Sequence, residues 1–259
     1  MRRPHLLAVA TALLLAGPLS SAGSDWEARD AESLGQGGVS AVGRLERSPG
    51  ACVEAGASAR FTVQEPYVGT DLVAGSIVLQ VASPDAAFAI GLAQLQSPVH
   101  RDTELDLGLQ VRRGALCLGA GATLDALAFT GYPTLFGLVT RLGAGGKLPY
   151  DALVAGVLEL GAGGAGARLP RVVVAAEVPL TDSIRLSLQH EREPGVASRT
   201  LAGLAWTHAV LRLLAGWDAT TRSGSMGVAC VWPHRRLAWA ATSHSELGWS
   251  HAWTCGFQR

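Results

Sequence analysis

Strict alternation between large apolar residues and small or polar residues is the feature that most constrains how this chain folds. Between positions 105 and 111 the odd residues are Leu, Leu, Leu and Val, whereas the even ones are Asp, Gly and Gln. From 247 to 257 every second residue is Leu, Trp, His, Trp, Cys or Phe, and the residues between them are Gly, Ser, Ala, Thr and Gly. Because a period of two places alternate side chains on opposite faces of a strand, both segments are predicted to be β-strands.

Turn signals separate the alternating runs at short intervals, with no helical pattern between them. They fall at 83–85, 97–98, 112–114, 131–133, 143–146, 193–195, 222–224 and 233–235. Such spacing is typical of an antiparallel meander. Between Thr70 and Phe257 we count roughly twelve candidate strands, many of them about ten residues long, which is the length that a tilted strand needs to cross a bilayer.

Two all-β architectures fit this pattern, and they differ in where the large side chains point. In a soluble β-sandwich these side chains fill a core, whereas in a membrane barrel they face lipid and the lumen is lined by small or polar groups. Six of the seven tryptophans lie between Trp206 and Trp253, and the faces opposite them are rich in Gly, Ala, Ser and Thr. We therefore predict an antiparallel up-and-down transmembrane β-barrel of 12 to 14 strands. A secreted β-sandwich binding protein is the alternative.

The first 22 residues have the features of a secretory signal peptide. Arg2 and Arg3 precede an uncharged apolar run over 6–16, and Ser20 and Ala22 occupy the small-residue positions of a cleavage site. The apolar run is much shorter than the roughly 20 residues of a spanning helix. We expect residues 1–22 to be removed on export, residues 23–60 to form an N-terminal hatch or plug, and residues 61–259 to form the barrel.

The charge balance and the cysteines exclude other classes of protein. Lys+Arg and Asp+Glu are each 21, so the chain lacks the basic excess that binds nucleic acid. After the signal segment the longest uncharged apolar run, 126–140, is interrupted by glycine and proline, which argues against helical spans. The four cysteines (Cys52, Cys117, Cys230 and Cys255) show no metal-ligand spacing. We expect single buried thiols, with one or two disulfides as the alternative.

The catalytic motifs of the sequence are all incomplete. Residues 161–166 satisfy the glycine fingerprint of dinucleotide-binding proteins, but a proline and a β-branched run follow where a helix is required, so a hairpin loop is predicted. The segment 223–227 lacks the first glycine of a nucleophile elbow, and the His190-Glu191 and His244-x-Glu246 pairs lack a second histidine. Ser250 and His251 are adjacent on a strand and therefore point to opposite faces. We expect no catalytic, metal or cofactor site and no enzymatic activity; the ligand-binding residues are not predicted.

Charged residues within the predicted strands are expected to avoid lipid. The charged cluster 100–104 is predicted to lie on a solvated rim of the barrel, with an inward-facing charge network as the alternative. Asp125, Glu159 and Glu177 lie in apolar strands, where a carboxylate facing lipid is unfavourable by a few kcal/mol, so they are expected to face the lumen or the rim. Arginines that such carboxylates can pair with there are Arg141, Arg168 and Arg185.

Four stretches of the chain resemble the sequence boxes of FadL-like outer-membrane barrels, specifically the PorV/PorQ group. They are SLGQGG at 33–38, SPGA at 48–51, HRDT at 100–103 leading into the strand 116–124, and ELGWSH at 246–251. Ser48, Gly50 and His100 depart from the asparagine, alanine and tyrosine of the corresponding family boxes. The boxes occur in the family order over nearly the whole chain after the signal segment.

The resemblance implies a location in the outer membrane and two classes of function, neither of them enzymatic. FadL-like barrels carry a hatch and pass hydrophobic molecules, whereas PorV-like members bind and shuttle proteins exported by the type IX system. We therefore predict a passive barrel that transports or binds a hydrophobic or protein ligand, with the type IX-like shuttle as an alternative. The implied partners are outer-membrane lipid, the barrel-insertion machinery and the ligand or exported protein, and no cofactor is implied.

Overall fold

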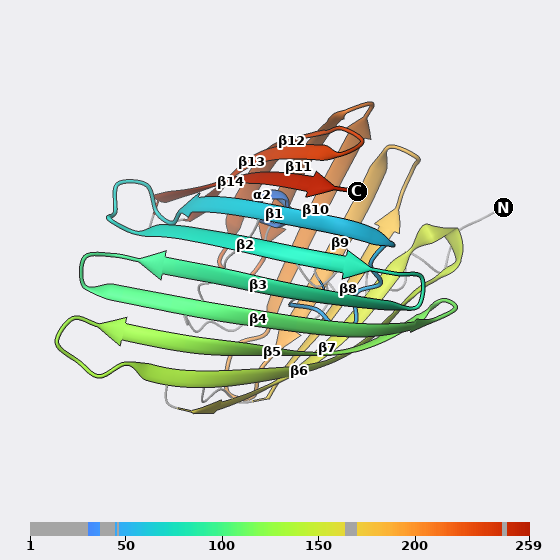
Figure 1. The fold of residues 1–259 in the computed structure, drawn as a ribbon. Helices are drawn as coiled ribbons and strands as arrows, with labels where there is room; N and C mark the ends of the chain where they lie inside the picture. The colour runs from blue at the N-terminus through green and yellow to red at the C-terminus, as the bar shows by residue number, and fades with distance from the viewer. Residues whose placement is uncertain (1–30, 37–44, 46, 164–169, 245–247) are drawn as a thin grey trace.

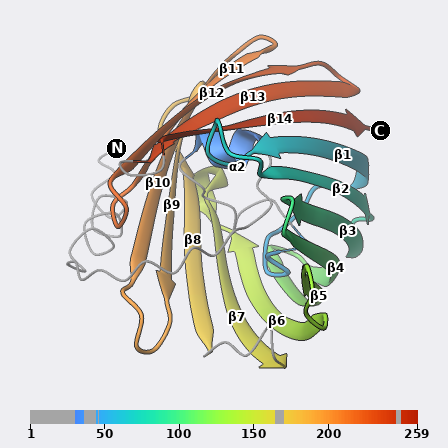
Figure 2. The same ribbon diagram turned by 90° about the vertical axis from the view of Figure 1, so that its left-hand side faces the viewer.

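The described residues form a closed antiparallel β-barrel of fourteen strands (Figures 1 and 2). The computed structural model describes residues 31–36, 45, 47–163, 170–244 and 248–259. Its elements in chain order are α2 (Ala31–Gly35), β1 (Gly56–Glu65), β2 (Val73–Ala82), β3 (Ala86–Gln96), β4 (His100–Arg113), β5 (Leu116–Phe129), β6 (Leu135–Lys147), η1 (Pro149–Asp151), β7 (Leu153–Gly163), β8 (Arg171–Pro179), β9 (Ile184–Arg192), β10 (Arg199–His208), β11 (Leu211–Asp218), β12 (Ser223–Val231), β13 (Arg235–His244) and β14 (Gly248–Gln258). The predicted barrel is confirmed, and the closed strand order excludes the β-sandwich.

Most large apolar residues of the strands point outward and most small or polar residues point inward, as the alternation predicts; the inward Leu201 and Val157 are among the exceptions. On β4, Leu109 is 59% exposed whereas the neighbouring Gln110 is 4% exposed. On β14, Trp253 is 55% exposed and Thr254 is 3% exposed. The core of this molecule is therefore the lumen of the barrel, and its outer surface is apolar.

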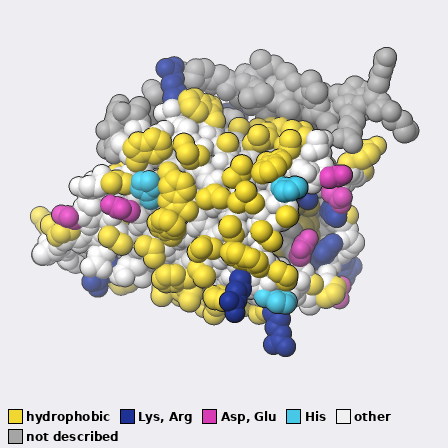
Figure 3. Space-filling model, turned by 90° about the horizontal axis from the view of Figure 1, so that it is seen from above, with side chains coloured by type: hydrophobic (Ala, Val, Ile, Leu, Met, Phe, Trp, Pro, Cys, Tyr) yellow, Lys and Arg dark blue, Asp and Glu magenta, His cyan; other side chains and the backbone are white. Residues whose placement is uncertain are grey.

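The outer surface carries a broad apolar band. In Figure 3 hydrophobic side chains cover most of the described surface of one face, and charged groups lie toward its edges. Exposed aromatic residues gather near the strand ends, with Trp217 and Phe136 at one end of the barrel and Trp232 and Phe257 at the other. Within the described part of the chain, no helix is long and apolar enough to cross a membrane.

The even number of described strands brings the start of β1 and the end of β14 to the same end of the barrel. We call this end the terminal rim and the opposite end the far rim. The two strands close the barrel through a continuous antiparallel register from Ser58 opposite Gln258 to Glu65 opposite His251. Turns at the terminal rim are short, such as 114–115 and 209–210, whereas the far rim holds longer ones such as 66–72 and 193–198.

The segment that precedes β1 lies inside the ring of strands, where Figure 2 shows α2 and the chain leading into β1. We call its described residues (31–36, 45 and 47–55) the plug segment. Leu45 is fully buried against Ala82, Ala87 and Ala89 on β2 and β3, together with Val53 of the plug segment itself. The first strand begins at Gly56, before the expected boundary at residue 61. The predicted signal peptide, 1–22, lies outside the described residues.

Candidate functional site

The plug segment fits against the barrel wall where glycines replace inward side chains on β5 and β6. A Cβ atom on Gly119 would lie 2.9 Å from the carbonyl carbon of Pro49, and one on Gly143 would lie 2.9 Å from the Cα of Gly50. A Cβ on Gly145 would overlap the carbonyl oxygen of Gly50. We call Gly119, Gly143 and Gly145 the glycine window, because only residues without a side chain let the plug backbone approach so closely.

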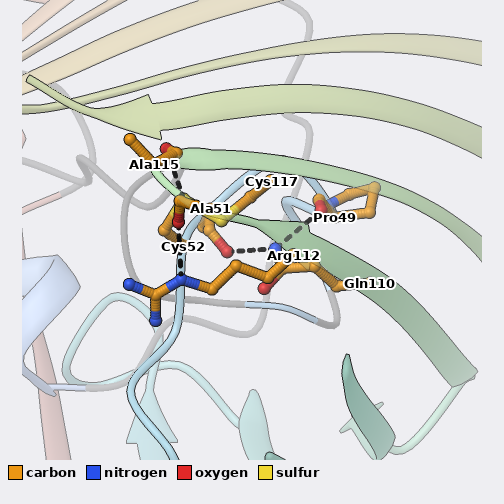
Figure 4. The surroundings of a disulfide bond; sticks show 8 residues. Pro49, Ala51, Cys52, Gln110, Arg112, Ala115 and Cys117 are labelled. Carbon is orange, nitrogen blue, oxygen red and sulfur yellow. Dashed lines mark hydrogen bonds between the residues drawn. A yellow bond between two sulfur atoms is a disulfide. The ribbon is translucent and has the colours of Figure 1, made fainter. Parts of the chain in front are cut away.

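A side-chain hydrogen bond and a disulfide hold the same stretch of plug segment (Figure 4). Gln110 of β4 is buried and donates from Nε2 to the carbonyl oxygen of Pro49 at 3.0 Å and to that of Ala51. Cys52 is joined to Cys117 of β5 by a disulfide. The expectation of single thiols is wrong for this pair, because the path of the plug segment along β5 brings the two cysteines together. Of the described cysteines, Cys230 and Cys255 are free.

The other end of the plug segment is held by a carboxylate between two arginines. Glu32 of α2 accepts a hydrogen bond from Arg212 of β11 at 3.1 Å and pairs with Arg236 of β13. Its neighbour Leu34 is buried against a patch of alanines on β12 to β14, namely Ala229, Ala238, Ala240 and Ala252. This end is therefore held by ion pairs and a small apolar contact, without a covalent bond.

A chain of ion pairs crosses the opposite half of the inner wall. We call it the charge belt, and its members are Arg47, Glu104, Asp106, Arg141, Glu159, Arg171 and Glu191. Arg141 Nε donates to Glu159 at 2.7 Å, and Arg171 contacts Glu159 at 3.3 Å and Glu191 at 2.6 Å. Five of these side chains are buried, and those of Arg47 and Glu159 are each 13% exposed, so each charge depends largely on its neighbours for compensation.

The plug segment supplies one member of the belt. Arg47 lies 3.1 Å from Asp106 Oδ2 and also pairs with Glu104, both on β4. Glu104 is buried and faces the lumen, so the prediction of a solvated rim is wrong at this residue and the inward alternative holds. The reason is that Arg47 comes from a segment far away in sequence, and it provides the counter-charge that makes burial of Glu104 acceptable.

The remaining half of the inner wall has a different chemistry. Inward positions on β12 to β14 are mostly Ala, Ser, Thr and Gly, with Ala229, Ala240 and Thr254 among the buried ones. The lumen thus carries the charge belt along β4 to β9, with an apolar cluster of Val157, Val173 and Ala175 on β7 and β8. Under α2 the inward residues are mostly small, and Arg212 and Arg236 are the charged groups that contact Glu32. A solute that follows the second half meets few groups that must be desolvated.

The structure places Ser250 and His251 on opposite faces of β14. Ser250 faces inward and accepts a hydrogen bond from the backbone N–H of Tyr67 at 3.0 Å. His251 lies on the outer face and stacks on Trp239, with ring centroids 5.8 Å apart. The predicted separation of Ser250 and His251 is confirmed. Within the described residues, no group of three or more His, Cys, Asp or Glu side chains is arranged to hold a metal ion.

The three carboxylates within apolar strands, Asp125, Glu159 and Glu177, lie where the sequence predicts, facing the lumen or the rim. Glu177 pairs with Arg185 at 2.7 Å, and Asp125 is the cross-strand neighbour of Glu104. Arg168 lies outside the described residues, as does the second half of the predicted hairpin loop 161–166. The first half, 161–163, belongs to β7, so the prediction of a loop is wrong there. At the terminal rim, the hydrogen bond and charge of Lys147 lower the pKa of Asp151.

Sequence reasoning missed the glycine window, Gln110 and the Glu32 ion pairs. A signal for the window does exist in the sequence. Gly119 and Gly121 follow each other at a spacing of two, and so do Gly143 and Gly145 on the next strand. Glycines that share one face of two neighbouring strands indicate that a backbone approaches there.

Comparisons with known proteins support the fold. A scan against protein-family models finds no match, and a search of curated proteins finds none either. Among solved structures, the chain is similar to the "CymD monoaromatic hydrocarbon channel", with a TM-score of 0.61 and 10% identity over 89% of this chain and 97% of that one. The KdgM porin gives a TM-score of 0.45 at 8% identity, covering 78% of this chain and 97% of that one. A mutant porin of Rh. blastica gives 0.45 at 7%, covering 79% and 99%. These structural neighbours are β-barrel channels.

Proposed function

We propose that this chain is an outer-membrane β-barrel that lets a hydrophobic ligand pass or bind, without enzymatic activity. The observation that carries the proposal is that the polarity of the two faces is the reverse of that in a soluble protein. Large apolar side chains lie outside, whereas buried ion pairs and small residues line the inside. Such a surface needs lipid around it, and a closed barrel leaves no strand edge unpaired there. Residues 1–22 would direct the export that such a location requires.

The turns support an orientation in that membrane. Outer-membrane barrels have short periplasmic turns and longer extracellular loops. The terminal rim has the shorter turns, so we assign it to the periplasm and the far rim to the exterior. The plug segment then acts as a hatch, entering from the periplasmic side.

The inner wall favours a hydrophobic solute over an ion. The charge belt pairs three arginines with four carboxylates, so an ion would have to compete with an existing partner to bind there. The alanine-lined half under α2 holds fewer charged groups, namely Arg212 and Arg236. A route along it opens when α2 leaves Arg212 and Arg236, while the disulfide keeps the rest of the plug segment attached.

The alternative of a type IX-like shuttle receives less support. A shuttle needs an exposed surface that recognises exported proteins. Among the described turns of the far rim, 97–99 is the shortest and 66–72 the longest. Turns of this size leave little loop surface for a protein ligand. The insertion machinery remains an implied partner under either function.

The first experiment separates membrane from soluble fractions of expressing cells and compares gel migration of the membrane fraction with and without heating. We expect a membrane-borne protein that migrates differently before and after heating, because a closed barrel keeps its fold in detergent. The second measures uptake of an aromatic hydrocarbon and of a charged sugar acid into liposomes. Uptake of neither solute, or of the acid alone, would contradict the proposed ligand class.

A further inference from the structure

An apolar groove runs along the outside of the barrel at the terminal rim, lined by residues of β1, β2 and β14. Figure 1 shows β1 and β14 side by side at the seam that the groove follows. Its volume is about 640 Å³, within the range of small-molecule sites. Its floor is formed by Ala57 and Ala59 of β1. Its walls are Phe257 of β14 on one side and Leu79 and Val81 of β2 on the other.

The register explains why a groove forms at this place. Ala59 lies directly between Phe257 and Leu79 across the three strands, and Ala57 lies opposite Val81. The next outward residue of β1 is Phe61, which is 55% exposed and ends the line of small residues. Two alanines among larger neighbours therefore leave a trough that follows the direction of the strand.

The open end of the groove carries positive charge. Arg259 continues the ladder beyond β14, where it exchanges two backbone hydrogen bonds with Ala57, and it lines the groove together with His234. Arg235 is exposed and lies opposite Phe257 on β13. Of the described residues that line the groove, none is acidic. An apolar trough that ends in basic side chains complements an acyl chain with an anionic headgroup.

We propose that this groove binds one phospholipid with an anionic headgroup from the periplasmic leaflet. The acyl chain lies on Ala57 and Ala59, and the phosphate lies against Arg259 and Arg235. The inference rests on the proposed function, because it takes the terminal rim as periplasmic and the outer face as lipid-exposed. It adds a specific lipid site at the point where the barrel closes.

The test uses native mass spectrometry of the barrel released from nanodiscs of equal parts phosphatidylethanolamine and phosphatidylglycerol. We expect one phosphatidylglycerol to stay bound under activation that strips the other lipids. Ala59→Trp fills the trough and should abolish retention. The matched control is Ala215→Trp on β11, an outward alanine that is exposed, lies between Leu204 and Met226 and should retain the lipid. Arg259→Ala should weaken retention about fivefold, as expected for one arginine at an anionic surface.

Several results would overturn the lipid site. These are a wild-type barrel without retained lipid, equal loss in both tryptophan variants, retention without headgroup preference, or a second copy of the chain bound in place of lipid. Heat-dependent gel migration of each variant is recorded beside the spectra, with Ala57→Leu as a second filling variant if Ala59→Trp does not fold. A wild-type chain without heat-dependent migration would reject the barrel in the membrane itself, so failure of the proposed function is distinguishable from failure of the lipid site.

Discussion

Adding a single methyl group to the glycine window should displace the plug segment from the barrel wall. In Gly143→Ala the new Cβ would lie 2.9 Å from the Cα of Gly50 and would overlap its backbone nitrogen. Both neighbours are backbone atoms, so no rotamer change relieves the contact. The stretch 48–51 must therefore move away from β6, and the two hydrogen bonds that Gln110 donates to it are lost.

The size of the effect follows from these contacts. Overpacking of a filled site typically costs about 1–3 kcal/mol, and each lost hydrogen bond contributes about 0.5–1.5 kcal/mol. We expect the state in which the plug segment packs on β5 and β6 to be destabilised by about 3 kcal/mol. This corresponds to a ~100-fold larger fraction of molecules with the segment displaced. Because the disulfide still tethers Cys52, the segment should loosen without leaving the barrel.

Hydrogen–deuterium exchange of the peptide covering residues 45–55 measures this loosening directly. The amide of Ala51, which donates to Ser48 at 2.9 Å, should exchange faster in Gly143→Ala. The control is Gly156→Ala on β7, where a Cβ would meet nothing closer than 3.9 Å. Equal exchange of this peptide in the two variants, both with intact heat-dependent gel migration, would refute the reasoning.

Three further predictions concern the charges and the disulfide. Glu32→Gln removes the charge that two arginines share, so uptake of a hydrophobic solute into liposomes should rise; unchanged uptake would argue against α2 as the moving part. Arg141→Ala removes a buried cation that contacts Asp106 and Glu159 and leaves Arg47 and Arg171 to compensate the four carboxylates of the charge belt, so it should cost about 3–5 kcal/mol of stability. Arg185→Ala, whose side chain is 43% exposed, should cost at most about 1 kcal/mol. Urea unfolding in detergent compares the two variants. Alkylation of the denatured, unreduced chain should modify two of the four cysteines, and modification of Cys52 and Cys117 without reductant would contradict the disulfide.

The barrel itself could be predicted because the alternation of side chains along a strand is a local feature of the sequence. Alternation on a strand needs only neighbouring residues, and a run such as 105–111 or 247–257 shows its lipid-facing and lumen-facing sides within a few positions. The estimate of the strand number rested on the spacing of the turn signals, and the fourteen described strands fall within the predicted range. The turn signal at 143–146 is wrong, because these residues lie within β6, where Gly143 and Gly145 face the plug segment.

The interior of the site could not be predicted, because its contacts are not local. Three strands lie between Arg47 and Glu104 in the chain, and no periodicity of the sequence records the path of the plug segment that brings the two side chains together. The same holds for Cys52 and Cys117, which lie 65 residues apart and meet only because the plug segment follows β5. Without that path, the inward position of Glu104 looked unfavourable and the cysteines looked independent.

The seam between β1 and β14 also sets the order in which this molecule can fold. The hydroxyls of Thr62 and Thr254 lie 3.0 Å apart across the seam, although the residues are 192 positions apart in the chain. Contacts of such high sequence separation form late, because the entropy of closing the loop opposes them until the intervening strands have paired. Until then β1 and β14 are free sheet edges, which can pair with other chains. Loss of β14 would therefore give an open, aggregation-prone sheet instead of a smaller barrel.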